Sequence, residues 1–326
     1  MRSWIRGSNL EVPKMSSDND PNPEPVSDVG STEGLFDAGQ KRRAQRFILQ
    51  LRGNPKAIVG LSVLGLLVLV ALIEPLIVPD AAIDGTDPTN QLQPPSLEHP
   101  FGTDHQGRDV LYRVLAGTSY SLQIALFSVG IATIVGVSLG AVAGYTEGNL
   151  DDGIMRPMDV LMSFPPVLFA LAVAAMLGPS LRNTIIAIGI VYTPYFARVV
   201  RSEVVSIKQR EFVEAARAVG ESDRRVLFVE VLPNAAGPII VQASISMAYA
   251  ILLAAALGFL GLGVQPPTPE WGVMIEQSTT YMRDYPWTMI FPGLAIATTV
   301  LAFNLFGDGI RDVLDPTIDT QLGGNE

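Results

Sequence analysis

The sequence predicts an all-α polytopic membrane protein with six transmembrane helices. Charged residues make up only 17% of the chain, against roughly 25% in a typical soluble protein. Hydrophobic residues make up 48%, and they fall into six runs long enough to cross a bilayer, for which about 20 apolar residues are needed. One such run can be a buried core helix, but six runs in one chain are typical of a membrane protein.

The second run contains a regular glycine pattern. The six runs are Ala57–Val78, Ser119–Gly144, Met158–Leu177, Asn183–Val200, Gly237–Gly263 and Pro286–Gly307. Gly136, Gly140 and Gly144 recur at every fourth position of the second run and therefore share one helix face. Small residues at this spacing let helix backbones approach closely, so we interpret them as a packing surface without a transport role.

The third and fourth runs contain prolines that disturb a regular helix. Pro165 and Pro166 are consecutive residues of the third run, and such a pair removes backbone donors and kinks the helix. A membrane helix tolerates this where neighbouring helices or a water-filled cavity satisfy the freed carbonyls. The kink is therefore either a local bend or a bend that lines a translocation path, and both interpretations remain open. Pro194 makes the fourth run the weakest of the six.

Basic residues are concentrated in two segments, which predicts the orientation in the membrane. Lys41–Lys56, before the first run, holds six basic residues and no acidic one. Seven more basic residues lie between Arg198, near the end of the fourth run, and Arg225, in the loop before the fifth run. Basic segments stay on the cytoplasmic side. The sequence thus predicts a protein of the cell (plasma) membrane with both termini in the cytoplasm. The acidic loop Tyr145–Pro157 is then cytoplasmic as well.

This pattern divides the chain into four parts. Residues 1–40 are polar and acidic and are predicted to be a disordered cytoplasmic tail, because they cannot bury enough apolar surface to fold. Residues 41–118 contain the basic segment, the first transmembrane helix and an outer loop. Residues 119–307 form a five-helix core with a cytoplasmic loop at 201–236, and residues 308–326 form a cytoplasmic C-terminal tail.

Composition excludes several kinds of chemistry. The chain has no cysteine, which excludes disulfides, zinc fingers, iron–sulfur clusters and thiol catalysis. Its formal net charge of −10 argues against a nucleic-acid partner. No lysine has the Gly-x-x-x-x-Gly-Lys context that cradles phosphates, so ATP chemistry is not expected on this chain. We predict no catalytic residue, no cofactor and no metal ligand.

The loop between the fourth and fifth runs contains a predicted amphipathic helix. Phe212, Ala215, Ala216 and Val219 follow a helical i, i+3, i+4, i+7 pattern, and Gly220 suits a helix C-cap. Nothing else in the sequence obviously covers this apolar stripe. The helix either lies in the membrane interface or docks into a groove of a soluble partner, and both interpretations remain open.

The same loop carries a motif that resembles a known family. Its residues are Glu214, Ala215, Ala216, Gly220, Leu232, Pro233 and Asn234. Their spacing resembles the EAA signature of the permease subunits of binding-protein-dependent ABC importers, although relatives often carry a histidine where this chain has Glu230. The stretches His99–Asp104, Leu257–Gly272 and Gly307–Pro316 narrow the resemblance to the C-type permeases of dipeptide, oligopeptide and nickel importers. The likeness runs from about residue 45 to residue 320.

The resemblance implies a fold, a function and a set of partners. The fold is that of a type I ABC importer permease. Such a subunit pairs with a second homologous permease and forms half of the translocation pathway for peptides or a related solute. Its EAA helix couples it to two separate ATP-binding subunits, where ATP is hydrolysed, and an extracellular substrate-binding protein delivers the substrate. The remaining partner is the lipid bilayer, and the transported solute is not identified by the sequence.

Three alternatives compete with this interpretation. An intramembrane protease needs a serine with a base, or two aspartates, inside the membrane. Both histidines, however, lie in one outer loop, and Asp159 is the only aspartate close to the interior of a membrane-spanning run. A metal site formed by His99 and His105 with Asp104 and Asp109 is a second alternative. A secondary transporter that works alone is the third, but such folds show internal repeats and polar sites at the midplane, and neither is evident here.

Overall fold

The computed structural model describes residues 49–314 of the chain. Every regular element in this part is a helix, and Thr103 and Asp109 form an isolated β-bridge. The helices are α2 (Pro55–Ile77), α3 (Asp80–Asp84), α4 (Val110–Thr146), α5 (Gly148–Met162), α6 (Pro166–Leu177), α7 (Leu181–Ile207), α8 (Glu211–Ala218), α9 (Asp223–Arg225), the π-helix η1 (Val226–Val231), α10 (Leu232–Phe259), α11 (Trp271–Ser278) and α12 (Trp287–Leu314). The predicted tail at 1–40 and the chain beyond Leu314 lie outside the described residues.

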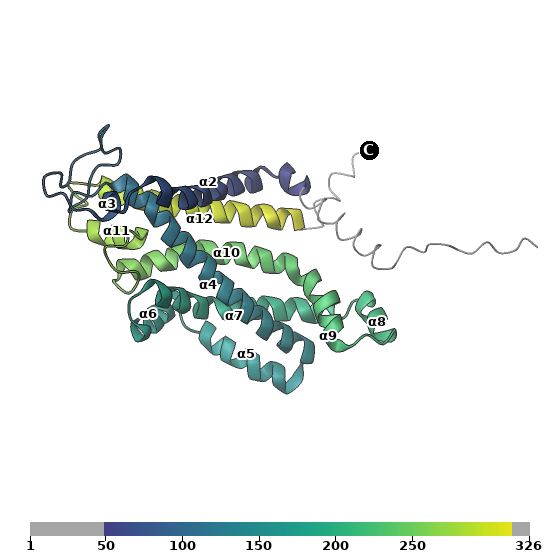
Figure 1. Cartoon of the computed structure of the whole chain (residues 1–326). Helices are drawn as coiled ribbons and strands as arrows, with labels where there is room; N and C mark the ends of the chain where they lie inside the picture. The colour runs from purple at the N-terminus through teal and green to yellow at the C-terminus, as the bar shows by residue number, and fades with distance from the viewer. Residues whose placement is uncertain (1–48, 315–326) are drawn as a thin grey trace, which may run out of the picture. The chain divides into compact units, whose positions relative to one another are not determined.

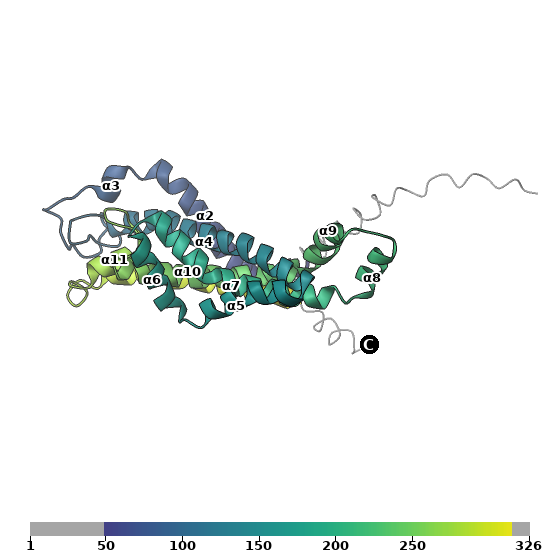
Figure 2. The ribbon, with the colours of Figure 1, turned by 90° about the horizontal axis from the view of Figure 1, so that it is seen from below.

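The long helices account for the predicted membrane spans. By length and composition, five helices of the described part can cross a membrane, and the bent pair α5 and α6 makes a sixth crossing if it counts as one span. Figures 1 and 2 show α8 and α9 at one end of these helices and α3 and α11 at the opposite end. We call these the α8 end and the α11 end. The prediction of an all-α polytopic protein is confirmed.

Polar side chains cap the N-termini of three of the long helices. Asn54, Asp109 and Ser180 each accept hydrogen bonds from backbone N–H groups in the first turn of α2, α4 and α7, respectively. Such caps satisfy donors that the first turn of a helix otherwise leaves free. Both α4 and α7 extend beyond the predicted runs: α4 begins at Val110, after its cap Asp109, rather than at Ser119, and α7 ends at Ile207 rather than at Val200.

The third span is broken at the kink that Pro165 and Pro166 predict, and it starts at Gly148 rather than at Met158. The chain forms α5 and α6, which are bent by 97° with respect to each other. Residues 163–165 separate them, because a residue before a proline avoids helical geometry, and Pro166 then starts α6 at a position that needs no donor. Helix α5 also occupies most of the segment Tyr145–Pro157, which was predicted to be a loop.

The fourth and fifth spans are more regular than predicted. Pro194 lies inside the continuous helix α7, so it does not end the span. After α8, the elements α9, η1 and α10 follow one another as a single helical stretch from Asp223 to Phe259. The fifth helix therefore starts well before Gly237.

The glycines of α4 form a close contact with α7. A Cβ atom added at Gly140 would lie 2.4 Å from the carbonyl oxygen of Ala197, and one added at Gly136 would lie 2.7 Å from that of Thr193. Gly144 meets the carbonyl oxygen of Arg201 in the same way, at 2.8 Å. The backbones thus touch along three turns, which confirms that this stripe is a packing surface.

Helices α2 and α12 pair although they stand at opposite ends of the described chain, and Figure 1 shows them side by side. Their contact again uses glycine: a Cβ at Gly60 would lie 2.6 Å from the backbone nitrogen of Phe306, and a Cβ at Gly309 would lie 2.5 Å from Ala57. Lys56 adds an ion pair of 3.3 Å with Asp312. The first and last long helices therefore close the bundle together.

Candidate functional site

Helix α8 presents an apolar surface at the α8 end. The predicted amphipathic helix is present, and its side chains Phe212 and Val219 are 38% and 80% exposed. Phe228 and Val229 of η1 are also more than half exposed. We call these four residues the α8 surface. Side chains of this size are normally covered in a folded protein, so the α8 surface is suited to a protein partner or a membrane.

Gly220 ends α8 in a left-handed conformation that glycine adopts readily. Its φ angle is 87°, and its N–H donates to the carbonyl of Arg217 at 2.9 Å. The next N–H, of Glu221, reaches back to the carbonyl of Ala216 at 3.1 Å. This pair of bonds is the Schellman arrangement, which satisfies the last carbonyls of a helix. Gly220 therefore determines where the chain leaves α8.

One apolar side chain of α8 fastens the helix to the bundle. Val213 is fully buried in a cluster that includes Val204 of α7, Val226 of η1 and Ala141 of α4. Ala216 of α8 and Leu232 of α10 pack against the same cluster. The structure thus brings the two halves of the sequence motif, Glu214–Gly220 and Leu232–Asn234, onto a common core.

Polar contacts that sequence reasoning missed tie the same loop to the end of α4. The hydroxyl of Tyr145 donates to Asp223 at 2.7 Å, and the Arg217 guanidinium lies 5.6 Å from the centre of the Tyr145 ring. Lys208 donates to the carbonyl of Tyr145 at 3.2 Å and pairs with Glu147 at 2.6 Å. These contacts join the segment around α8 to the end of α4, which in turn packs closely on α7.

The remaining residues of the motif lie at the start of α10. The Asn234 side chain donates to the carbonyl of Glu230 at 2.6 Å, across the junction between η1 and α10. Pro233 is exposed and stands in the first turn of α10, where its missing donor has no cost. These residues shape the helix that follows α8 rather than contributing to the α8 surface.

The proline bend lies apart from the motif and borders a pocket. Pro166 lines a pocket of about 620 Å³ together with Tyr192 and Tyr195 of α7 and with Gln242, Ser246 and Tyr249 of α10. Apolar side chains of α6 and α10 complete the lining, which contains no charged residue. A pocket of this size holds a small solute. The bend therefore does more than change the helix direction, because it forms one wall of a cavity.

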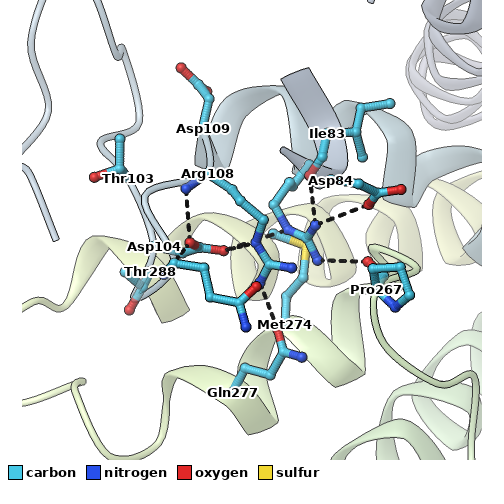
Figure 3. Close-up of polar contacts among 12 residues, drawn as sticks. Ile83, Asp84, Thr103, Asp104, Arg108, Asp109, Pro267, Met274, Gln277 and Thr288 are labelled. Carbon is cyan, nitrogen blue, oxygen red and sulfur yellow. Dashed lines mark hydrogen bonds and ion pairs between the residues drawn. The ribbon is translucent and has the colours of Figure 1, made fainter. Parts of the chain in front are cut away.

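At the α11 end, two arginines join segments that are far apart in the sequence (Figure 3). Arg113 is 1% exposed and donates to the carbonyls of Ile83 and Pro267, at 2.8 and 3.2 Å. Arg108 donates to Asp104 at 2.7 Å and to Gln277 of α11 at 3.2 Å. Two of the three stretches that narrowed the sequence resemblance thus meet here, the first through Asp104 and the second through Pro267, and they form a cap on the bundle.

The two histidines of this region make separate contacts. His99 Nδ1 lies 2.8 Å from Asp109, the residue that caps α4, whereas His105 stacks on Tyr281 with ring centres 5.4 Å apart. Among residues 49–314, no group of three or more His, Asp or Glu side chains is arranged to hold a metal ion. The contacts of both histidines are therefore accounted for by packing within the cap.

Glu270 makes the stability of this cap dependent on pH. It is 2% exposed, and one carboxylate oxygen accepts the N–H of Val273 at 3.0 Å. Burial raises the pKa of the Glu270 carboxyl from 4.5 to about 7, against the opposing effect of hydrogen bonds from Gly272 and Val273. Between pH 4.5 and about pH 7, the Glu270 carboxyl therefore keeps its proton in the folded protein but loses it in the unfolded chain. The resulting stabilisation is complete below about pH 4.5 and is lost as the pH rises through 7.

We expect Glu270→Gln to raise the melting temperature at pH 8 and to flatten its decline between pH 5 and pH 8. At pH 8 the free energy of unfolding of the variant should exceed that of the wild type by about 3 kcal/mol, because each pKa unit corresponds to about 1.4 kcal/mol. Thermal unfolding of the purified protein in detergent at several pH values measures this. Glu276→Gln, an exposed position of the same helix, is the control and should change neither value. A melting temperature of Glu270→Gln below that of the wild type at pH 8 would contradict the prediction.

The fold and the site together define a class of protein. The chain has the long apolar helices of a multi-pass membrane protein, a solute-sized pocket among them, and an exposed apolar helix coupled to the bundle at one end. These features are those of a membrane transport subunit.

Sequence comparisons identify the family. Residues 136–320 match the family described as the binding-protein-dependent transport system inner membrane component, and residues 43–95 match the N-terminal transmembrane domain of oligopeptide transport permease C. The chain belongs to this family of binding-protein-dependent permeases. It is therefore a multi-pass inner-membrane transport subunit rather than an enzyme, and its family works with ATPase and substrate-binding components. Both the protease and the lone secondary transporter are thereby excluded.

Several relatives match most of this chain. The dipeptide transport system permease protein of Alkalihalophilus pseudofirmus is 48% identical over 267 residues, which cover 82% of this chain and 88% of the relative. The probable D,D-dipeptide transport system permease protein of Escherichia coli is 41% identical and covers 83% and 91%, respectively. The glutathione transport system permease protein of Pectobacterium atrosepticum is 43% identical and covers 82% and 89%.

A solved structure supports the fold. A chain of the MetNI methionine ABC transporter in an inward-facing conformation matches 63% of this chain and 98% of its own length, with a TM-score of 0.54 and 17% identity. The type I importer permease fold that the sequence resemblance implies is thus confirmed.

Proposed function

We propose that this permease forms one half of the translocation pathway of a peptide importer, and that a second homologous permease forms the other half. Two ATP-binding subunits complete the complex on the α8 side, and an extracellular binding protein delivers peptides at the α11 end. Both termini are cytoplasmic in this arrangement. The basic residues of Lys41–Lys56 and of the loop that contains α8 support this orientation.

The observation that carries the proposal is the exposed but anchored helix α8. Its outer side chains Phe212 and Val219 are uncovered, whereas Val213 on its inner side is fully buried. A helix that rested in the membrane interface would need no rigid connection to the bundle, but a helix that receives force does. We infer that Glu214, Ala215 and Ala216 belong to the docking helix, and that Gly220 and Leu232–Asn234 fix its position.

Peptides are the substrate class that the pocket and the relatives favour. The pocket beside Pro165 and Pro166 combines tyrosine, glutamine and serine side chains with apolar ones, a lining that accepts both the backbone and varied side chains of a peptide. The relatives described above are named as transporters of dipeptides and of glutathione. Dipeptides and tripeptides are therefore the proposed substrates.

Uptake into liposomes tests the proposal. The complete transporter, with both permeases, the ATP-binding subunits and the binding protein, should accumulate a radiolabelled dipeptide inside liposomes only when ATP is present on the side of α8. Free amino acids of the same composition serve as the control cargo and should not accumulate. Dipeptide accumulation that needs no ATP, or that this chain achieves alone, would overturn the proposal.

A further inference from the structure

Two ion pairs connect α5 and α7, and they differ in geometry and in exposure. Arg201 binds Asp151 through both Nε and Nη2, at 2.6 and 2.5 Å, and the Asp151 side chain is only 10% exposed. Arg198 contacts Asp159 through Nη2 alone, at 2.6 Å, and the two side chains are 53% and 57% exposed. The first pair is a closed, bidentate clamp, whereas the second is open.

The open pair lies within the length of the membrane-spanning segments. Arg198 stands nine residues, or about 13 Å along the helix axis, before α7 ends at Ile207. Asp159 lies three residues before the end of α5, next to the bend. Exposed charges at such a depth are costly against lipid. This face of α5 and α7 is therefore turned toward water or protein rather than toward acyl chains.

The open pair continues the lining of the pocket at the bend. Tyr192, Tyr195 and Arg198 follow one another at intervals of three residues on α7, so their side chains share one side of the helix. The two tyrosines line the pocket, and Arg198 stands one turn closer to the α8 end. The central part of α7 is 61% buried, against at most 44% in the other four long helices. Along this series the exposure rises from Tyr192, which is 8% exposed, to Arg198, whose side chain is 53% exposed. The most enclosed helix therefore opens beside the pocket, on the side of the α8 end.

The chemistry of Arg198 fits a carboxylate. A guanidinium has five N–H donors, and Asp159 receives a hydrogen bond from only one of its nitrogens. The remaining donors are free to form the two parallel bonds that arginine makes with a carboxylate. Asp159 keeps the net charge of the pair at zero, so the pair repels neither end of a zwitterion. A free anion without an ammonium group would be less well matched.

We propose that Arg198 is a substrate-contacting residue of the translocation path, where its guanidinium takes the C-terminal carboxylate of a peptide in transit. Asp159 holds the guanidinium when no peptide is present and then faces the ammonium group of the bound peptide. This inference rests on the peptide transport proposed above and adds to it a residue that selects for a free carboxyl terminus.

Saturation-transfer NMR on the complex of both permeases with the ATP-binding subunits, without nucleotide and without the binding protein, tests this inference. Alanyl-phenylalanine and its C-terminal amide are the two probes. The wild type should bind the acid about tenfold more strongly than the amide, as expected for a charge-assisted pair. Arg198→Gln should remove the preference. Arg182→Gln, an exposed arginine at the other end of α7, is the matched control and should keep it.

A second variant distinguishes recognition from simple bracing of the two helices. Asp159→Asn frees Arg198 without removing it, so the preference for the acid should persist or increase. If the pair only braced α5 against α7, Asp159→Asn and Arg198→Gln would behave alike, and that result would overturn the inference. Equal binding of acid and amide by the wild type would also overturn it. Absence of ATP-driven dipeptide uptake by the wild type would instead overturn the proposed function on which it rests.

Discussion

A Gly220→Val substitution is expected to reduce ATP-driven transport at least about tenfold while the complex still assembles. Gly220 has a φ of 87°, a conformation that costs an L-residue roughly 1–2 kcal/mol and a β-branched residue more. Valine would therefore break the two hydrogen bonds that end α8 and would displace the α8 surface from its partner. Because 1.4 kcal/mol corresponds to a factor of ten, the strain is sufficient for this loss.

Paired measurements of ATP hydrolysis and dipeptide uptake in liposomes test this expectation. The control is Gly153→Val, an exposed glycine of α5 with open space where a Cβ would stand, and it should transport normally. Glu214→Arg provides a second route to the same outcome, because it reverses an exposed charge on α8 without backbone strain. If both Gly220→Val and Glu214→Arg transported as much dipeptide per ATP hydrolysed as the wild type, α8 would have no docking role.

Gly140→Val is expected to have the largest effect on stability. The added Cβ would lie 2.4 Å from the carbonyl oxygen of Ala197 and 2.9 Å from Val200. Backbone atoms cannot rotate away as a flexible side chain can, so α4 and α7 must separate. Overpacking of a core typically costs about 1–3 kcal/mol, and here the loss extends to neighbouring contacts along the same glycine face. We expect little folded protein to be recovered from membranes.

Gly130→Val is the matched control for this experiment. It lies on the same helix, α4, but no atom stands within 4 Å of a Cβ at that position. The thermal unfolding temperature and the yield of purified protein should therefore match those of the wild type. If Gly140→Val unfolded at the same temperature as Gly130→Val, the close approach of α4 and α7 would not determine stability.

The sequence was sufficient to predict the helical class and the positions of the long apolar helices, because runs of apolar residues report burial in lipid directly. It did not predict where the helices end. Arg113 and Arg201 interrupt the apolar pattern, yet they lie inside α4 and α7, because Asp84, Asp104 and Asp151 from distant segments compensate their charges. Helix α5 was missed for the same reason, since its charged residues resemble those of a loop.

The motif around Gly220 could be recognised from spacing alone, because a helix followed by a glycine is a local pattern. The pocket could not, because Pro166, Tyr195 and Tyr249 come from three helices that only the tertiary fold brings together. The importance of Asp159 was also hidden. It was visible as an ionisable residue at the start of the third run, but its partner, Arg198, stands 39 positions away.

The pairing of α2 with α12 has a consequence for biosynthesis. The ribosome completes α2 long before α12, because the 209 residues between Ile77 and Trp287 must first be translated. At about 5–20 residues per second, this takes roughly 10–40 s. During that time the face of α2 around Gly60 lacks the neighbour that it has in the folded protein. An unfinished chain of this protein therefore leaves this face of its first helix uncovered until its last helix has been made.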